Sequence, residues 1–232
     1  MSNKSQLSAQ RSGTIINGKS KNEDKKCMFA VETLIQDLQY KFNVKLEHVK
    51  NLYLKDVVEK LKKDYPQVDF NYYFDTSRMS PDGGITFLAD KKNKLYPVLI
   101  VEAKNQGTND YRTSIGKQKQ AKGNAIERLG KNVIGLRTFM LSENIFPFVC
   151  FGDGCDFAQD SSILDRVVTI AMFGELNKTY LFNQGNKGEF NRGSYYFKTE
   201  EWKLEEIMPI INDVATRSIY YYFSKYGEET FR

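Results

Sequence analysis

The chain has 232 residues, of which 41% are hydrophobic and 13% aromatic, which suits one large folded domain with a sizeable core. Its formal net charge of +5 permits a polyanionic partner without proving one. His48 is the one histidine, which excludes a histidine-rich zinc site, a HEXXH metalloprotease helix and a two-histidine relay within one chain.

The cysteines and the hydropathy pattern indicate the compartment. Cys27, Cys150 and Cys155 have no CxxC spacing, and an odd number of cysteines favours a reducing environment over secretion. No apolar run approaches the ~18 residues of a membrane span, and the N-terminus lacks the apolar stretch of a signal peptide. We therefore expect a cytoplasmic protein that makes no membrane contact.

The first part of the chain divides into an arm and two helices. Residues 1–26 are polar and mixed in charge, which predicts a flexible N-terminal arm ahead of a single domain over 27–232. Apolar residues at helical spacing predict one helix over 27–42 and another over 52–63, which Tyr65-Pro66 ends.

Strands are predicted in the middle of the chain. The alternating aromatic residues of 68–74 indicate a strand, and the segment 80–104 reads as a β-hairpin that turns near 90–94. Its second arm, 95–103, is almost continuously apolar, which predicts a central strand covered on both faces. Residues 146–151 predict another buried strand.

Helices are expected in the second half as well. The pattern of 119–143 is helical, with a predicted break between Gly130 and Gly135, whereas 152–195 reads as irregular. Residues 200–223 predict a long amphipathic helix with a kink or boundary at Pro209. The mixed order of elements predicts the α/β class, as one domain with a central mixed β-sheet flanked by helices.

The most informative constellation is Asp82, Glu102 and Lys104. Side chains alternate along a strand, so Glu102 and Lys104 point the same way, while the hairpin can bring Asp82 beside them. Two carboxylates and the Ala103 carbonyl would form an all-oxygen site of the kind that Mg²⁺ prefers. Lys104 would orient an attacking water and offset charge on a phosphoryl transition state. An E-x-K pair at a strand edge is more often a solvated surface pair, but a carboxylate at the mouth of a buried strand needs a partner or a metal.

A second constellation follows in QAKGNAIER, residues 120–128. Asn124, Glu127 and Arg128 share one helix face, and Gly123 lets that helix approach another molecule closely. Asn and Arg make bidentate contacts with adenine and guanine edges in the major groove. By itself this face reads more often as a surface ion pair of little energetic value.

These segments carry a resemblance to a known family. The sequence resembles the EcoRI family of type II restriction endonucleases, within the wider PD-(D/E)xK nuclease fold. The matching segments span about a third of the chain; they are SPDGG (80–84), VEAKNQG (101–107), GNAIER (123–128), KN (131–132), FMLSE (139–143), FPFV (146–149) and, more weakly, LDR (164–166).

The resemblance implies a role for each matching residue. Asp82, Glu102 and Lys104 match the catalytic residues, with Mg²⁺ held by the two acids. Gln120 and Ala121 match an extended segment that touches pyrimidines, and Arg166 matches an arginine implicated in reading the outer base pair. The helix face of Asn124, Glu127 and Arg128 matches the part that reads the inner adenines. The full set expected to bind DNA is Gln120, Ala121, Lys122, Gly123, Asn124, Ala125, Glu127, Arg128 and Arg166.

The resemblance also implies an assembly and a product. It predicts a homodimer on palindromic double-stranded DNA that leaves 5′ overhangs, and a cognate DNA methyltransferase in the host as a functional partner. Two departures bear on the outer base pair of the site, because Gln120 replaces a methionine of the family pattern and Ile163 a second arginine.

Three functions compete at this stage. The leading hypothesis is a Mg²⁺-dependent, site-specific DNA endonuclease. A structure-specific repair nuclease of the same fold would not need an adenine-reading helix. A catalytically silent DNA-binding module would not place two acids beside DNA phosphates, because uncompensated acids weaken binding.

Overall fold

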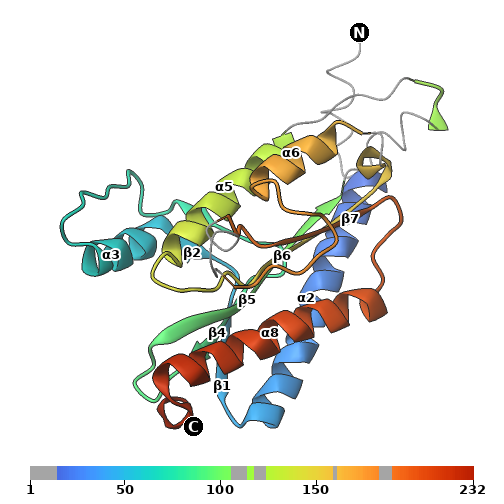
Figure 1. The fold of residues 1–232 in the computed structure, drawn as a ribbon. Coiled ribbons are helices and arrows are strands. Elements are labelled where there is room, and N and C mark those ends of the chain that lie inside the picture. The colour runs from blue at the N-terminus through green and yellow to red at the C-terminus, as the bar shows by residue number, and fades with distance from the viewer. Residues whose placement is uncertain (1–14, 106–113, 118–123, 159–160, 183–189) are drawn as a thin grey trace.

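A computed structural model describes residues 15–105, 114–117, 124–158, 161–182 and 190–232 (Figure 1). Its centre is a five-stranded sheet in the order β1-β4-β5-β6-β7, and a separate pair joins β2 to β3. The strands are β1 (Lys45–Val49), β2 (Leu52–Tyr53), β3 (Arg78–Met79), β4 (Ile85–Ala89), β5 (Leu95–Asn105), β6 (Phe148–Asp153) and β7 (Ser194–Lys198).

The sheet is mixed. β4 runs antiparallel to both β1 and β5, whereas β6 runs parallel to both β5 and β7. The β4–β5 pair confirms the predicted hairpin, and Asn93 supplies the positive φ of 59° in its turn. A mixed sheet flanked by helices in one domain confirms the predicted fold class.

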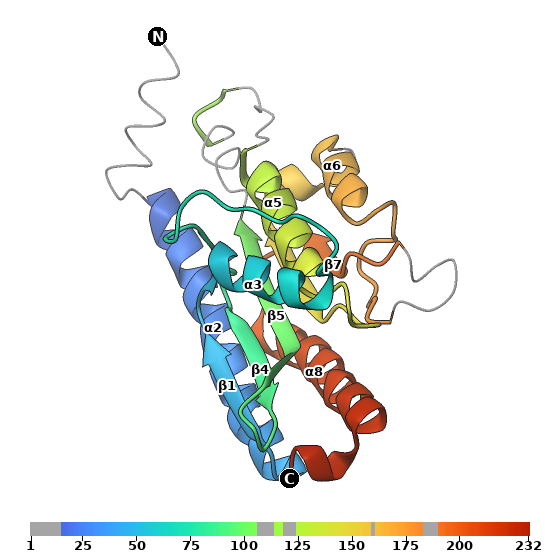
Figure 2. The ribbon, with the colours of Figure 1, turned by 90° about the vertical axis from the view of Figure 1, so that its left-hand side faces the viewer.

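Helices cover both faces of this sheet (Figures 1 and 2). α2 and α8 pack on one face, and α3, α5 and α6 lie on the other. Their bounds are α2 (Ile15–Phe42), α3 (Leu54–Asp64), α5 (Asn124–Phe139), α6 (Ile163–Ile170) and α8 (Leu204–Tyr226), with short 3₁₀ turns at η1 (Cys155–Phe157) and η2 (Glu228–Thr230). None of the helices in the described part of the chain is long and apolar enough to cross a membrane.

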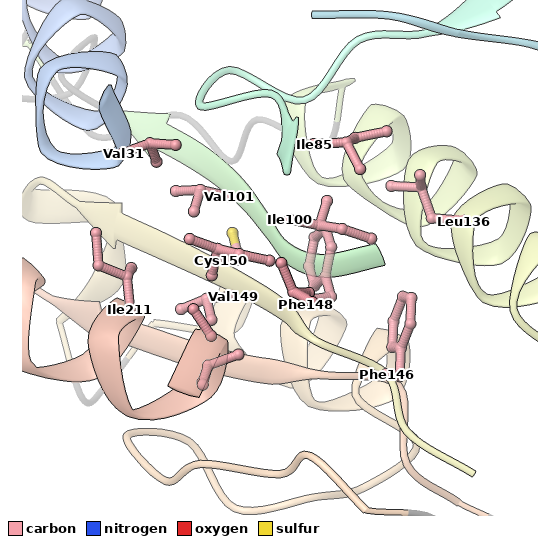
Figure 3. Close-up of a cluster of buried hydrophobic side chains, with 14 of the residues drawn as sticks. Val31, Ile85, Ile100, Val101, Leu136, Phe146, Phe148, Val149, Cys150 and Ile211 are labelled. Atoms are coloured by element: carbon pink, nitrogen blue, oxygen red, sulfur yellow. The ribbon is translucent and has the colours of Figure 1, made fainter. Parts of the chain in front are cut away.

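The core lies on both sides of β5, as its apolar sequence predicted. Figure 3 shows Val31 of α2 and Ile211 of α8 on one side of the sheet and Leu136 of α5 on the other. Val98 and Ile100, in the middle of β5, are fully buried. Glu102 therefore continues a strand that is sealed from water on both faces.

Two helices are longer or straighter than predicted. α2 begins at Ile15 rather than at residue 27, and residues 1–14 of the expected arm lie outside the described residues. α5 shows no break at Gly130 or Gly135. A Cβ at Gly135 would collide with the Met79 sulfur, so this glycine allows close helix packing instead of ending the helix.

The strand predicted over 68–74 is wrong. This segment is a turn-containing connection between α3 and β3, and Val68, Tyr73 and Phe74 are exposed. Its aromatic alternation has no sheet to bury it. The stretch 152–195, expected to be irregular, contains α6, and it leads into β7, which begins at Ser194. α8 continues through Pro209, near its first turns, where the predicted boundary does not occur.

Candidate active site

Two glycines bring Asp82 against β5. The Gly83 amide donates to the Val101 carbonyl at 2.9 Å, and the Val101 amide donates to the Gly84 carbonyl at 3.2 Å. A Cβ at Gly83 would lie 2.7 Å from the Val101 Cβ, and Gly84 has a φ of +71°. Side chains at these positions would push Asp82 away from the strand, so the sequence Asp-Gly-Gly is required by local geometry.

The predicted catalytic residues converge on one point. Lys104 Nζ donates to Asp82 Oδ2 at 3.0 Å and to the Ala103 carbonyl at 2.8 Å, and it forms a short contact with Glu102 Oε1. Asp82 Oδ2 also accepts from the Ala103 amide at 3.1 Å. The structure thus brings together all four residues that were expected to form the site.

Burial sets the charges of this cluster. Glu102 is 2% exposed, and its burial raises the pKa of the carboxyl to about 7, an effect that the Asp82 charge adds to and Lys104 opposes. Burial alone would lower the pKa of Lys104, but the charges of Glu102 and Asp82 raise it above its ordinary value. Lys104 therefore keeps its positive charge, whereas the Glu102 carboxyl holds its proton to a higher pH than an exposed glutamate does.

The donor set fits a hard divalent cation. The oxygens that converge on the Lys104 ammonium are two carboxylates and one carbonyl, which are the ligand types of Mg²⁺. No donor in the described part of the chain reaches Glu102 Oε2, which is buried. Within the same described residues no group of three His, Cys, Asp or Glu side chains gathers, so water and a substrate phosphate would have to complete the coordination.

The raised pKa of Glu102 predicts an effect of pH on stability without metal. Unfolded Glu102 releases its proton near its ordinary pKa of 4.5, and folded Glu102 near 7. Between these values the unfolded state binds fewer protons, so the free energy of unfolding falls as pH rises, by at most about 3 to 4 kcal/mol. Urea unfolding in EDTA from pH 4 to 8 should show this fall in the native chain and a smaller one in Glu102→Gln. Parallel pH profiles of the two proteins would contradict the assignment.

The expected DNA contacts begin at one end of α5. Gln120, Ala121, Lys122 and Gly123 lie outside the described residues, and Asn124 and Ala125 open the helix. Glu127 and Arg128, in the first turns of the helix, are exposed, which a face that contacts DNA bases would require.

Arg166 lies exposed on α6, the helix beside α5 (Figure 1). Ile163, which replaces an arginine of the family pattern, is 6% exposed and belongs to the core. The buried Ile163 side chain offers no hydrogen-bonding group to a base edge.

One side chain of the site was missed by sequence reasoning. Asn132 of α5 donates to Glu102 Oε1 at 3.4 Å. Its spacing of four residues from Arg128 places it one turn along the same face, which was the available signal. Glu32 is exposed on α2, where its charge acts on His48.

Comparisons with known proteins identify the family of the chain. The family model described as "Restriction endonuclease EcoRI" matches residues 9–163. The type II restriction enzyme RsrI of Cereibacter sphaeroides is 30% identical over 211 residues, which cover 76% of each chain. The type II restriction enzyme EcoRI of Escherichia coli is 36% identical over 119 residues, or 48% of this chain and 43% of that one. The chain therefore belongs to the EcoRI family of type II restriction endonucleases.

Proposed function

We propose that this enzyme hydrolyses one phosphodiester bond in each strand of a palindromic DNA site and requires Mg²⁺ to do so. The observation that carries the proposal is the convergence of Asp82, Glu102 and the Ala103 carbonyl on the Lys104 ammonium. This cluster lies beside α5, whose first turns hold the expected base-reading residues. Chemistry and recognition would then meet at one edge of the sheet.

Each residue has a role in the hydrolysis. Asp82, Glu102 and the Ala103 carbonyl would hold Mg²⁺, which when bound offsets phosphate charge and makes water a better nucleophile. Lys104 would orient the attacking water and stabilise the negative charge that develops on the phosphoryl oxygens. The buried wall around Glu102 keeps bulk water away and strengthens these charge interactions.

The recognition site should have AATT at its centre. Asn124 and Arg128, one turn apart on α5, have the side chains that pair with purine edges, and Glu127 lies beside them. The flanking pair should depend on Arg166 and Gln120; an arginine bidentate to guanine would give GAATTC. The absence of a second arginine at Ile163 favours a relaxed or different flank.

A homodimer follows from the symmetry of the reaction. One chain holds one set of Asp82, Glu102 and Lys104, and a double-strand cut at symmetry-related bonds takes two sets. A two-fold dimer on a palindrome would place them with equal geometry, and would leave 5′ overhangs if each strand is cut near the 5′ end of the site. A cytoplasmic endonuclease of this kind would depend on a DNA methyltransferase that protects the host genome.

Incubation of the purified protein with phage DNA and Mg²⁺ tests the proposed function. Discrete fragments are the expected result, with no cleavage in EDTA. A smear would indicate a nuclease without sequence specificity, and retarded but uncut DNA would indicate a binding module; either result would overturn the proposal.

Loss of Asn124 should weaken specific binding selectively. A good bidentate base contact contributes ~1–3 kcal/mol of discrimination, so Asn124→Ala should lower affinity for the cognate site by about 5- to 150-fold and leave non-specific affinity almost unchanged. Gel shifts in Ca²⁺ with a cognate and a scrambled duplex measure both affinities. Lys117→Ala, which removes an exposed charge suited to phosphate, is the control and should weaken both about equally. Equal losses in Asn124→Ala would count against base reading.

A further inference from the structure

Asn132 is the point where α5 touches the catalytic acid. Its amide nitrogen lies 3.4 Å from Glu102 Oε1, the oxygen that also contacts Lys104. The bond is long, but it joins a half-buried amide to a carboxylate that is 2% exposed, where water cannot replace it. Within the described residues, Lys104 and Asn132 are the two side chains that donate to this carboxylate.

The two donors differ in what they do to the acid. Lys104 brings a full positive charge, which competes with a metal for the same oxygens. Asn132 is neutral, so it can fix the orientation of the carboxylate and leave its charge available. Holding Oε1 also fixes the position of Oε2, which has no donor in the described part of the chain and would be available to a cation.

α5 packs tightly on the sheet, so a shift of this helix would be passed on to the residues that it contacts. Leu129, Val133 and Leu136 are 0% exposed and anchor the helix on the sheet. Gly135 packs directly on Met79, three residues before Asp82. The helix therefore contacts Glu102 through Asn132, and through Gly135 it contacts Met79, in the segment that leads to Asp82. A shift of α5 would disturb both acids.

The same helix carries the expected reading face. Arg128 is exposed one turn before Asn132, and residues four apart lie on one side of a helix. A helix is stiff over two turns. If the first turn of α5 moves along the helix axis, Asn132 moves with it and displaces the Glu102 carboxylate. Misplacement of a catalytic group by about 1 Å can cost a hundredfold in rate.

We propose that Asn132 is a positioning residue that orients Glu102 for metal binding and ties its position to the helix that reads DNA. The inference rests on the proposed function of the site. It assigns Asn132 no contact with the reacting atoms.

The test compares Asn132→Ala with Asn132→Gln, whose amide can still reach the carboxylate, and with Thr138→Val as a matched control. The Thr138 hydroxyl donates to the Ile134 carbonyl within α5, so this control removes a polar group from the same helix without touching the site. Three quantities are measured: DNA affinity in Ca²⁺, Mn²⁺ affinity by electron paramagnetic resonance in a Ca²⁺-free complex with a duplex that carries a non-cleavable linkage at the scissile position, and kcat and KM for cleavage of the natural duplex in Mg²⁺.

The expected result is a selective defect. Asn132→Ala should weaken Mn²⁺ binding about 10-fold and lower kcat about 10- to 100-fold, with DNA affinity and KM unchanged. Asn132→Gln should recover a large part of both losses, and Thr138→Val should behave as the native chain. Native Mn²⁺ affinity and kcat in Asn132→Ala would overturn the inference. A loss that appears in DNA affinity alone would do the same, because it would place Asn132 on the phosphate backbone.

A double-mutant cycle separates this inference from the proposed function. In metal-free buffer, Asn132→Ala should lower the melting temperature more in the native background than in Glu102→Ala, because the donated hydrogen bond exists only in the first. This coupling does not depend on nuclease activity. If the native chain cuts no DNA, the proposed function fails while the cycle still reports on the contact; additive effects in the cycle would refute the contact itself.

Discussion

Lys104→Ala should lose DNA cleavage by at least about 1000-fold and keep its specific binding. Lys104 is 13% exposed and contacts both carboxylates, so no solvent group replaces its charge at the scissile phosphate. We propose that α5, and not Lys104, reads the bases, so affinity for the cognate duplex should survive. Single-turnover cleavage in Mg²⁺ and gel shifts in Ca²⁺ measure the two properties.

Glu102→Ala and Asp82→Ala should follow the same pattern, because both acids act on the scissile phosphate and its metal. Lys178→Ala is the matched control, since it removes a lysine from an exposed ion pair with Glu175. Near-native turnover in Lys104→Ala would show that the catalytic assignment is wrong. A loss of turnover in the control would point to a general effect of net charge.

Removal of divalent metal should abolish cleavage to a similar extent. Two acids beside a DNA phosphate weaken its binding until a cation offsets their charge, and a bound metal would supply several kcal/mol of transition-state stabilisation. Mg²⁺ or Mn²⁺ should restore activity. Ca²⁺ should support specific binding without cutting, because it accepts the same oxygen ligands in a looser geometry. Efficient cutting in EDTA would contradict a metal-dependent mechanism.

The convergence of Asp82, Glu102 and Lys104 could be predicted from sequence because its geometry is local. Glu102 and Lys104 share a strand, and strand alternation alone places them on one side. The β4–β5 hairpin, which turns at Asn93, brings Asp82 beside them. Gly83 and Gly84, which follow Asp82, allow its close approach to β5. Each step relies on a short-range rule, and the structure bears out all of them.

The errors lie where tertiary packing decides. The aromatic residues of 68–74 suit a strand, but no neighbouring strand is available to pair with them. Gly130 and Gly135 read as helix breakers, yet Gly135 serves the close approach of α5 to Met79. β7 was missed, although Tyr195 and Phe197 are almost fully buried, because it is short and its partner β6 lies more than 40 residues earlier in the chain.

Asn132 belongs to the same class of omission. The residue was visible in sequence as part of the KN pair, but its contact with Glu102 joins a helix to a strand 30 residues away. Helical periodicity indicates the face of α5 on which Asn132 lies, but it does not indicate that Glu102 is its partner. Contacts of this kind depend on how α5 crosses the sheet, which single-sequence patterns do not specify.

The most direct test of the central claim is to sequence the ends of fragments from a complete digest in Mg²⁺. The account predicts that every cut lies in the same palindromic site, with AATT at its centre, and that every end has a 5′ overhang. It also predicts that Lys104→Ala yields no such ends. Fragment ends that share no palindrome, or that share one without AATT, would contradict the claim that the face of α5 reads the DNA that Asp82, Glu102 and Lys104 cut.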